Sequence, residues 1–352
     1  MNKFWSSMVR RTKPYVPGEQ VNSENLLKLN TNENPYPPSP HVTKAIEGEM
    51  HRHLQLYPSP TADRLREVIA DKHQLTKDHI FIGNGSDEVL AFSFMAFFEP
   101  GQTIRFPNIT YSFYPVYSKI FDIPYETVPL QDDFTICPKD YFNAQGGVIF
   151  PNPNAPTSLY LELEAIEQIL QQNPNQVVII DEAYIDFAKT SAATLIEQYE
   201  NLLVVQTTSK SRSLAGLRVG FALGQPHLIE ALMRIKDSIN SYTIDRLALV
   251  GATEAFLDEE YFTKTTNHII DTREKVTTEL EALGFTVLPS QTNFVFVTNE
   301  HQNAKRLYEQ LKADDVLVRH FDVEPIEQYL RISIGTDEQM KQFITSLKQH
   351  LA

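Results

Sequence analysis

The sequence has a single cysteine, Cys137, and few basic residues. One cysteine cannot form a disulfide bond within the chain, which favours a reducing compartment. The 31 lysines and arginines are outnumbered by 45 acidic residues, which gives a formal net charge of −14. General binding to nucleic acids or acidic membranes requires a basic face, so we expect neither. A local cationic pocket remains compatible with this charge.

Long apolar runs are also absent. No stretch approaches the roughly 20 residues of a transmembrane helix. Residues 1–20 lack the apolar core and the cleavage site of a secretory signal. Together with the single cysteine, these absences predict a soluble, cytoplasmic protein without a membrane partner.

Several catalytic motifs are missing as well. The sequence contains no G-x-x-x-x-G-K-[ST], no G-x-S-x-G and no H-E-x-x-H. His51 and His53 are near neighbours, but no cluster of cysteines or histidines completes a metal site. We therefore expect no metal and interpret both histidines as surface residues. The segment GNGSDE has Glu88 where a dinucleotide-binding motif needs its third glycine.

The remaining pattern is an alternation of expected strands and helices. The segments 177–180 and 202–205 are continuously apolar, as in strands covered on both faces of a parallel sheet. They predict an α/β fold, with a mainly parallel, doubly wound sheet in a large domain at 45–240. The Pro-rich arm at 1–44 should wrap a surface or a partner. A smaller α+β domain at 241–352 should begin with one long helical stretch at 246–284.

Ligands of such a sheet bind beyond the carboxyl ends of its strands. The first informative end, FIGNGSDEVL, places Ser86 and Asp87 at a helix N-terminus, which can bind phosphate through backbone amides. A plain glycine turn with a helix cap is the alternative. The second end, VIFPNPNAPT, presents Asn152 and Asn154 on a rigid loop or forms a surface turn.

Two further strand ends carry charged residues. Asp181 ends the apolar strand of VVIIDEAY, where a buried carboxylate requires a partner, and Tyr184 could face the same site. A helix cap or a loop acid is the alternative. Lys210 follows the hydroxyl residues Thr207 and Ser209 and is a candidate nucleophile or an ordinary surface lysine. Because these features lie on successive strands, they favour one shared site.

Four segments, in this order, carry a resemblance to a known family: NPNAPT, DEAYIDF, TTSKSRSLAGLRVGF and LRISIGT. They resemble the fold-type I aminotransferases, which use pyridoxal phosphate (PLP). The resemblance covers nearly the whole chain, and its specific element is S-K-x…G-L-R-x-G. Within this family, LNTNENPYPPSP, LQLYPSPTADRLREVIA and GNGSDEVL are most similar to the histidinol-phosphate aminotransferases.

The resemblance implies roles for the residues around the PLP ring. Lys210 would hold the cofactor covalently and move the proton between the substrate Cα and C4′ of PLP. Asp181 would pair with the pyridinium nitrogen, which keeps the ring an electron sink. Asn154 and Tyr184 would hydrogen-bond the ring oxygen O3′, and Tyr111 would stack on the ring. Asn154 would also contact the substrate.

The resemblance also implies how the anionic groups are bound. The cofactor phosphate would be held by Ser86, Asp87, Thr207, Ser209 and Arg218. Arg331 would bind the acidic group of the substrate, with Arg319 as a second candidate, because guanidinium groups match such oxygens. Tyr57 would reach the phosphate and the substrate in the neighbouring subunit of a homodimer. The arm would then pack on the smaller domain and on the partner subunit.

One residue departs from the family pattern. After Lys210 the sequence reads SRS, where relatives often carry an apolar segment. No role in the site follows for Arg212, and we expect a solvated loop charge there.

The implied reaction joins L-histidinol phosphate and 2-oxoglutarate to give imidazole-acetol phosphate and glutamate, a step of histidine biosynthesis. Aromatic amino-acid aminotransferases and the threonine-phosphate decarboxylases share every PLP contact named above, so the motifs leave these substrates open. A nucleotide-binding dehydrogenase using GNGSDE and a PLP-binding regulatory domain are the alternatives from other classes.

Overall fold

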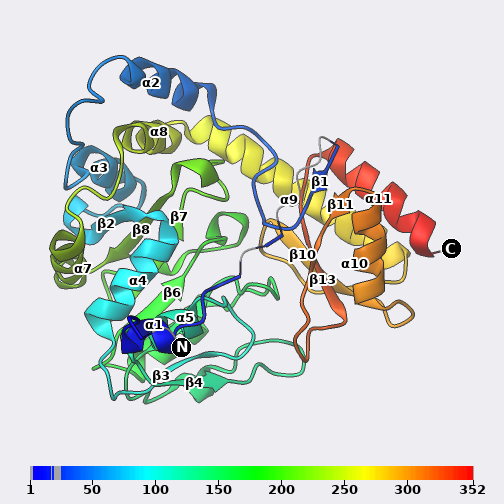
Figure 1. Ribbon diagram of the computed structural model, residues 1–352, viewed down its shortest axis with the longest axis horizontal. Coiled ribbons are helices and arrows are strands. Elements are labelled where there is room, and N and C mark those ends of the chain that lie inside the picture. Colours follow the sequence, from blue (N-terminus) through cyan, green and yellow to red (C-terminus); the bar gives the residue numbers. More distant parts are fainter. Residues whose placement is uncertain (1–2, 17, 20–24, 352) are drawn as a thin grey trace.

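The computed structural model describes residues 3–16, 18–19 and 25–351. Its strands form a seven-stranded sheet, a four-stranded sheet and a two-stranded pair. Figure 1 shows the large sheet with its helices on the left and the smaller sheet, with α10 and α11, on the right. The long helix α9 (Glu259–Ala282) connects the two parts.

The large sheet has the strand order β2-β8-β7-β6-β5-β3-β4. Its strands are β2 (Ile80–Asn84), β3 (Ile104–Pro107), β4 (Tyr125–Val128), β5 (Val148–Pro151), β6 (Val178–Asp181), β7 (Leu202–Thr207) and β8 (Val219–Gly224). Only β8 runs antiparallel to its neighbours β2 and β7; the other pairs are parallel. The predicted α/β class with a mainly parallel sheet is therefore confirmed.

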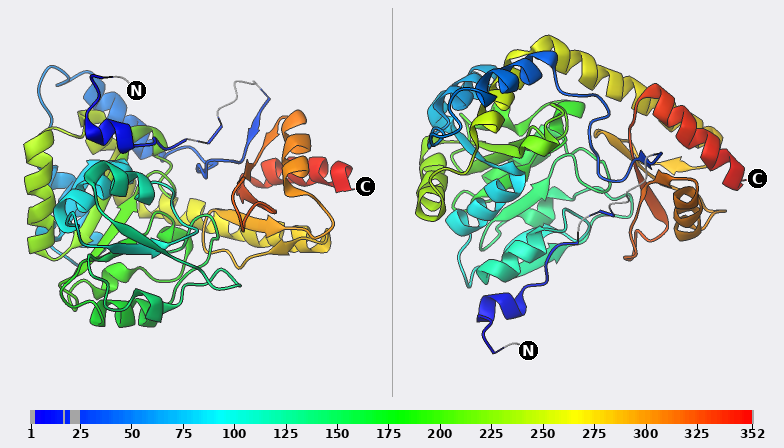
Figure 2. Two further views of the ribbon diagram at one scale, coloured as in Figure 1. Left: turned by 60° about the horizontal axis from the view of Figure 1, so that its bottom comes forward. Right: turned by 45° about the horizontal axis from the view of Figure 1, so that its top comes forward.

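Helices cover both faces of this sheet (Figure 2). In β6, Val178 and Ile180 belong to one core cluster and Ile179 to another, which explains why the strand is apolar at every position. The first cluster includes residues of α2 (Pro40–Met50), α3 (Asp63–Lys72), α6 (Leu163–Gln171) and α8 (Arg246–Leu257). The second includes residues of α4 (Gly85–Phe97), α5 (Tyr114–Phe121) and α7 (Pro226–Ile239).

The smaller sheet is antiparallel, with the order β12-β13-β10-β9. Its strands are β9 (Thr286–Val287), β10 (Phe294–Thr298), β12 (Arg319–His320) and β13 (Tyr329–Ser333). Its core cluster includes residues of α9, α10 (Ala304–Ala313) and α11 (Asp337–Leu351). The register pairs Arg319 with Arg331, so the two arginines lie side by side.

The N-terminal segment contacts both parts of the molecule. Helix α1 (Ser7–Arg11) lies on α5, where the Arg11 guanidinium donates hydrogen bonds to the carbonyls of Lys119 and Ile120. Strand β1 (Leu27–Lys28) pairs in parallel with β11 (Val316–Leu317) of the smaller part. The described residues of this segment therefore contact the large part through α1 and the smaller part through β1. Contact of the arm with a partner subunit stays a prediction.

The predicted single helix at 246–284 is wrong, because the structure breaks it into α8 and α9 at Asp258. The Asp258 carboxylate accepts a hydrogen bond from the backbone N–H of Tyr261 and so caps α9. Ala248, Ala252 and Phe256 of α8 belong to the core of the large sheet. We therefore propose that the boundary between the two domains lies at Asp258 and not at residue 240.

The sequence AATLIEQY at 192–199 also predicts a helix, and this prediction is wrong. Only the short 3₁₀ turn η4 (Ala192–Leu195) forms there, and the Glu182 carboxylate holds its start by accepting from the Ala192 N–H. The other 3₁₀ turns are η1 (Lys77–His79), η2 (Pro138–Tyr141), η3 (Ile185–Phe187) and η5 (Ala215–Leu217). Across the described ranges, the helices are too short or too polar to span a membrane.

Candidate active site

A cavity of about 300 Å³ opens at the carboxyl ends of the parallel strands. Pro151, Asp181 and Thr207 end β5, β6 and β7 and line this cavity. Arg218 lines it from the start of β8, since that strand runs in the opposite direction. Arg331 of the smaller sheet closes the far side. The shared edge that the sequence predicts is therefore a cavity between the two sheets.

Lys210 projects into this cavity from the loop after β7. Its Nζ donates a hydrogen bond to the carbonyl of Thr31 at 3.1 Å and lies 5.9 Å from the centroid of the Tyr184 ring. Thr31 belongs to the N-terminal arm, so the arm lies directly beside the amine. The amine shares the cavity with the Tyr184 ring and with the buried carboxyl of Asp181. A primary amine in such surroundings is suited to react with a carbonyl compound.

Asp181 is 4% exposed and has one oxygen without a partner. Its Oδ2 accepts from the Tyr114 hydroxyl at 2.9 Å, whereas the buried Oδ1 makes no hydrogen bond within the described residues. Burial raises the pKa of this carboxyl to about 7. An unpaired buried acceptor is costly, so the geometry indicates a ligand donor or cation at Oδ1.

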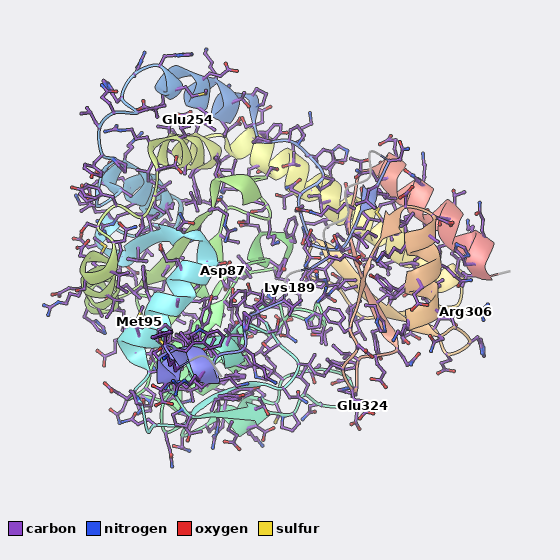
Figure 3. The ribbon with its side chains drawn as sticks, viewed as in Figure 1. Asp87, Met95, Lys189, Glu254, Arg306 and Glu324 are labelled. Carbon is purple, nitrogen blue, oxygen red and sulfur yellow. The ribbon has the colours of Figure 1, made fainter. Side chains whose placement is uncertain are left out.

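The start of α4 is arranged to bind an anion. The first turns of a helix present unpaired N–H groups and a partial positive charge, and Ser86 and Asp87 of this turn line the cavity. Asp87 is labelled in Figure 3, beside α4. A Cβ at Gly220 would lie 2.3 Å from the Ser86 nitrogen, so only glycine lets β8 pass this close. Arg218 donates to the Asp87 carboxylate at 3.0 Å and brings its guanidinium to the same turn.

Hydroxyl groups complete this anion site. Thr207 donates to the Ser209 Oγ at 3.0 Å, and both residues line the cavity. The Tyr111 hydroxyl donates to the second oxygen of Asp87 at 2.7 Å, which fixes its ring at the cavity wall. Amides, hydroxyls and a guanidinium together match the oxygens of a phosphate group.

Tyr184 and Asn154 differ in what they can offer to a ligand. The Tyr184 hydroxyl accepts from the Asn32 amide at 2.9 Å, which leaves its own hydrogen available for donation. Asn154 uses both amide hydrogens on Ile109 and Thr157, and its buried Oδ1 has no partner among the described residues. Tyr184 therefore supplies a donor, and Asn154 in this orientation supplies an acceptor.

Two arginines form the opposite wall of the cavity. Arg331 is partly buried, donates through Nη2 to the Asn30 carbonyl at 2.8 Å, and has a buried Nε without a partner in the described chain. Its guanidinium lies 5.3 Å from the centroid of the Phe294 ring. Arg319 lies 5.4 Å from the centroid of Phe321, which also lines the cavity. Burial lowers the pKa of Arg331, and an anionic ligand would offset this cost.

The charges of the cavity contrast with those of the whole chain. Its lining contains the cations Lys210, Arg218, Arg319 and Arg331 and only the acids Asp87 and Asp181. In a protein of net charge −14, this local excess of positive charge selects anionic ligands.

The structure brings most of the predicted site residues together. The predicted residues that line the cavity are Ser86, Asp87, Tyr111, Asp181, Tyr184, Thr207, Ser209, Lys210, Arg218, Arg319 and Arg331. Asn154 is buried beside the lining residues Ala155 and Pro156. Tyr57 lies elsewhere: it is 77% exposed and stacks on Tyr242 with a centroid distance of 4.6 Å. Its role in a neighbouring subunit stays a prediction.

The prediction that Arg212 is a solvated loop charge is wrong. The residue is only 6% exposed and forms an ion pair with Glu259 at 3.1 Å. A buried guanidinium has to satisfy its donors inside the protein, and residues distant in sequence do so here.

Among the contributors to the site that sequence reasoning missed are Tyr15, Asn32 and Tyr114. Tyr15 and Asn32 line the cavity from the arm. Tyr114 holds Asp181 from the first turn of α5. Tyr114 had one signal, its position in an aromatic segment after β3, and such a position does not give the direction of a side chain.

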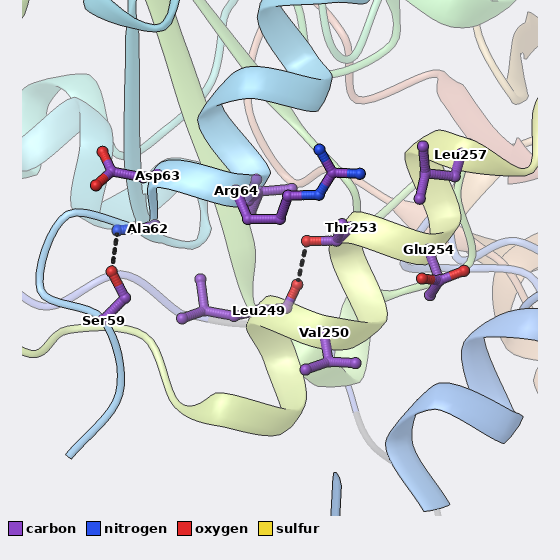
Figure 4. Close-up of a pocket in the computed structure, with 10 residues that line it drawn as sticks. Ser59, Ala62, Asp63, Arg64, Leu249, Val250, Thr253, Glu254 and Leu257 are labelled. Atoms are coloured by element: carbon purple, nitrogen blue, oxygen red, sulfur yellow. Dashed lines mark hydrogen bonds between the residues drawn. The ribbon is translucent and has the colours of Figure 1, made fainter. Parts of the chain in front are cut away.

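A second cavity of about 300 Å³ lies between α3 and α8 (Figure 4). Its lining includes Arg64, Leu249, Glu254 and Leu257, but none of the predicted site residues. Within the described ranges, no three or more His, Cys, Asp or Glu side chains gather as metal ligands. The chemistry is therefore concentrated in the cavity around Lys210.

Comparisons with known proteins agree with this geometry. The family model described as aminotransferase class I and II matches residues 24–347. Histidinol-phosphate aminotransferase 1 of Oceanobacillus iheyensis is 58% identical over 347 residues, which cover 99% of this chain and 98% of that protein. Histidinol-phosphate aminotransferase of Clostridium acetobutylicum is 52% identical over 352 residues, or 100% of both chains.

Among solved structures, the histidinol-phosphate aminotransferase of Sinorhizobium meliloti in complex with pyridoxal-5'-phosphate has a TM-score of 0.89 and 24% sequence identity. The match covers 100% of this chain and 98% of that chain. This likeness shows the fold that the two chains share.

Proposed function

The chain belongs to the family of class I and II aminotransferases, and on that premise we propose that it uses PLP to transfer the amino group of L-histidinol phosphate to 2-oxoglutarate. The products are imidazole-acetol phosphate and glutamate. One observation carries the proposal: the amine of Lys210, the unpaired Oδ1 of Asp181 and the anion site at α4 meet in a single cavity. The names of the curated relatives support the substrate.

The residues present fit the cofactor. When bound, PLP supplies an electron sink that stabilises negative charge on the substrate Cα. The unpaired Oδ1 of Asp181 would hold the proton on the ring nitrogen. Tyr184, whose hydroxyl hydrogen is available, would donate to O3′, and Asn154 would be the second hydrogen-bonding partner of O3′. Tyr111 would stack on the ring.

The anionic ends of cofactor and substrate would bind at opposite walls. Arg218, the α4 amides at Ser86 and Asp87 and the hydroxyls of Thr207 and Ser209 would hold the cofactor phosphate. Arg331 would bind the acidic group of the substrate with its free Nε, and Arg319 would assist it. Lys210 would hold the cofactor between these walls and move the proton at Cα.

We expect purified protein to use L-histidinol phosphate with a kcat/KM about tenfold to a hundredfold above that for L-phenylalanine. Each charge-assisted hydrogen bond to a phosphate contributes roughly 1.5–3 kcal/mol, and phenylalanine has no phosphate. Steady-state kinetics with 2-oxoglutarate as acceptor measure the ratio. L-Histidinol, which lacks only the phosphate, is the matched control. A clear preference for phenylalanine would contradict the proposed substrate and indicate an aromatic amino acid instead. It would not contradict the proposed use of PLP.

We also propose a cytoplasmic homodimer in which Tyr57 of one subunit reaches the cofactor phosphate of the other. The support is an exposed apolar patch on the segment around Tyr57. Leu54 is 58% exposed, Leu56 is 55% exposed, and Tyr242 stacks on the Tyr57 ring. Exposed apolar patches of this kind are typical of protein interfaces.

Mixing two inactive or weakened variants tests this shared site. Lys210→Ala should lose at least about 10³-fold in kcat, and Tyr57→Phe should bind PLP about tenfold more weakly, since it loses one hydrogen bond to a charged group. In a mixed dimer, one site contains both wild-type Lys210 and wild-type Tyr57. Cofactor affinity measured on the mixture after subunit exchange should therefore recover toward the wild-type value for that site. A simple average of the two variants would exclude the contribution across the interface.

A further inference from the structure

Arg212 is a buried cation two residues beyond Lys210 in the chain. Burying a guanidinium is unfavourable unless its donors and its charge are satisfied. The residue is not among those lining the cavity, so the proposed chemistry does not explain its burial. Its contacts show what it holds in place.

The guanidinium binds the junction between α8 and α9, which we define as residues 255–262. Its Nη1 donates to the carbonyl of Ala255, and its Nη2 donates to the Glu259 carboxylate at 3.1 Å. The rings of Phe256 and Phe262 lie with their centroids 3.9 and 4.0 Å from its central carbon. One side chain therefore contacts the last turn of α8 and the first turn of α9 together.

The Glu259 carboxylate extends this link to α3. The Lys72 Nζ donates to both Glu259 oxygens, at 2.9 and 2.7 Å. Only a planar group with several donors can bind a carbonyl and a carboxylate while packing on two rings, which explains arginine at this position. Helix α9 then continues to the smaller sheet (Figure 1).

The residues next to Arg212 are held by other segments. The Asn34 amide donates to the carbonyls of Lys210 and Ser211, at 2.8 and 3.1 Å. The Ser211 hydroxyl donates to Asp186, in the turn that follows Tyr184. The backbone that carries Lys210 is thus held from the arm, from the β6 end of the sheet and, through Arg212, from the α8–α9 junction.

We propose that Arg212 is a positioning residue that fixes the backbone of Lys210 relative to the α8–α9 junction and so holds its amine in the cavity. The inference rests on the proposed function, because the exact place of this amine matters only if it reacts. Arg212 touches neither substrate nor cofactor in this assignment. It acts through Ser211, the one residue that separates it from Lys210 in the chain.

The test compares Arg212→Gln with Arg66→Gln in the PLP-loaded, full-length enzyme. Arg66 is a matched control, because it is also buried, donates to the backbone carbonyls of Lys77 and Ile80 and, like Arg212, does not line the cavity. Unlike Arg212, it is not a near neighbour of Lys210 in the chain. Three quantities are measured for each: the melting temperature, kcat and KM for glutamate, and the rate at which the visible absorbance of bound PLP is lost on dilution. The wild-type protein is measured first.

We expect both variants to melt at lower temperature and only Arg212→Gln to lose function. Its kcat should fall about tenfold to a hundredfold, the cost of a misplacement near 1 Å, while KM for glutamate changes by less than about threefold because Arg331 is intact. Loss of bound PLP should accelerate about tenfold, since Lys210 retains it. Arg212→Lys keeps the positive charge but lacks the planar guanidinium with its several donors. Its kcat and its rate of PLP loss should therefore lie between those of the wild type and Arg212→Gln.

The proposal is overturned if Arg212→Gln, assayed well below its melting temperature, keeps the kcat and the PLP release rate of Arg66→Gln. If Arg212→Gln does not fold, Arg212→Lys and Glu259→Gln undergo the same comparison with the same criteria. A wild-type protein that shows no PLP absorbance or no transamination would instead contradict the proposed function, so the two failures are distinguishable.

Discussion

Replacing Lys210 by alanine should reduce kcat for transamination by at least about 10³-fold and remove the visible absorbance that the purified protein shows with PLP. The amine is assigned two tasks, covalent retention of the cofactor and proton transfer at the substrate Cα, and a positioned acid–base group alone contributes roughly 10²–10⁴-fold. No other lysine lines the cavity in the described chain. Absorbance spectra and single-turnover kinetics with glutamate measure both tasks.

Lys189→Ala is the control for this experiment. Lys189 is exposed, pairs with Glu162 and does not line the cavity (labelled in Figure 3), so its loss should change neither kcat nor the spectrum by more than about twofold. Full activity of Lys210→Ala would refute the assignment of the reactive amine and with it the proposed mechanism.

The fold and the reacting groups were predictable from the sequence because both follow from local patterns. Continuously apolar runs such as 177–180 predict a buried parallel sheet, and the carboxyl ends of such strands share one edge. The shared edge predicted that Asp181 and Lys210 lie in one site, without any knowledge of side-chain directions. The break at Asp258 could also have been found, since DEE is typical of a helix start.

The residues that hold the reacting groups were not predictable in this way. Tyr114 is 67 residues from Asp181 in the chain, and Arg212 is 47 residues from Glu259. In the sequence, Arg212 stands between two serines and has the pattern of a solvated loop. Its burial depends on how α8 and α9 pack beside the large sheet, which is a tertiary property that no local propensity encodes.

Asparagine in place of Asp181 should lower kcat by about 100-fold or more, the usual loss when one preorganised electrostatic partner is removed from a reacting group. The amide keeps the size of the side chain and can still accept from Tyr114, but it cannot balance a positive charge at the position facing Oδ1. Burst and steady-state kinetics with L-histidinol phosphate or glutamate measure the loss. Glu182→Gln is the matched control, because Glu182 is the neighbouring buried carboxyl and lies outside the cavity lining.

The same two variants should also change the stability of the protein. Here the expected change at high pH is a gain in the free energy of unfolding, whereas the change in kcat is a loss. Burial raises the pKa of Asp181 from 3.8 to about 7 and that of Glu182 from 4.5 to about 7. The folded chain then binds these protons more tightly than the unfolded chain, so the free energy of unfolding of the cofactor-free protein falls as pH rises from about 4 to about 7. For Asp181 this loss is at most about 4 kcal/mol.

Each substitution removes one titrating carboxyl, so the free energy of unfolding of both variants should depend less on pH. The difference in this free energy between variant and wild type should therefore shift in favour of the variant from pH 4 to pH 8. Only Asp181→Asn should combine this gain with a large loss of kcat. That combination identifies a charge buried for catalysis at the expense of stability. Two results would show that Asp181 is a structural carboxyl. One is an equal loss of activity in the two variants. The other is a free energy of denaturant unfolding that depends on pH as steeply in Asp181→Asn as in the wild type.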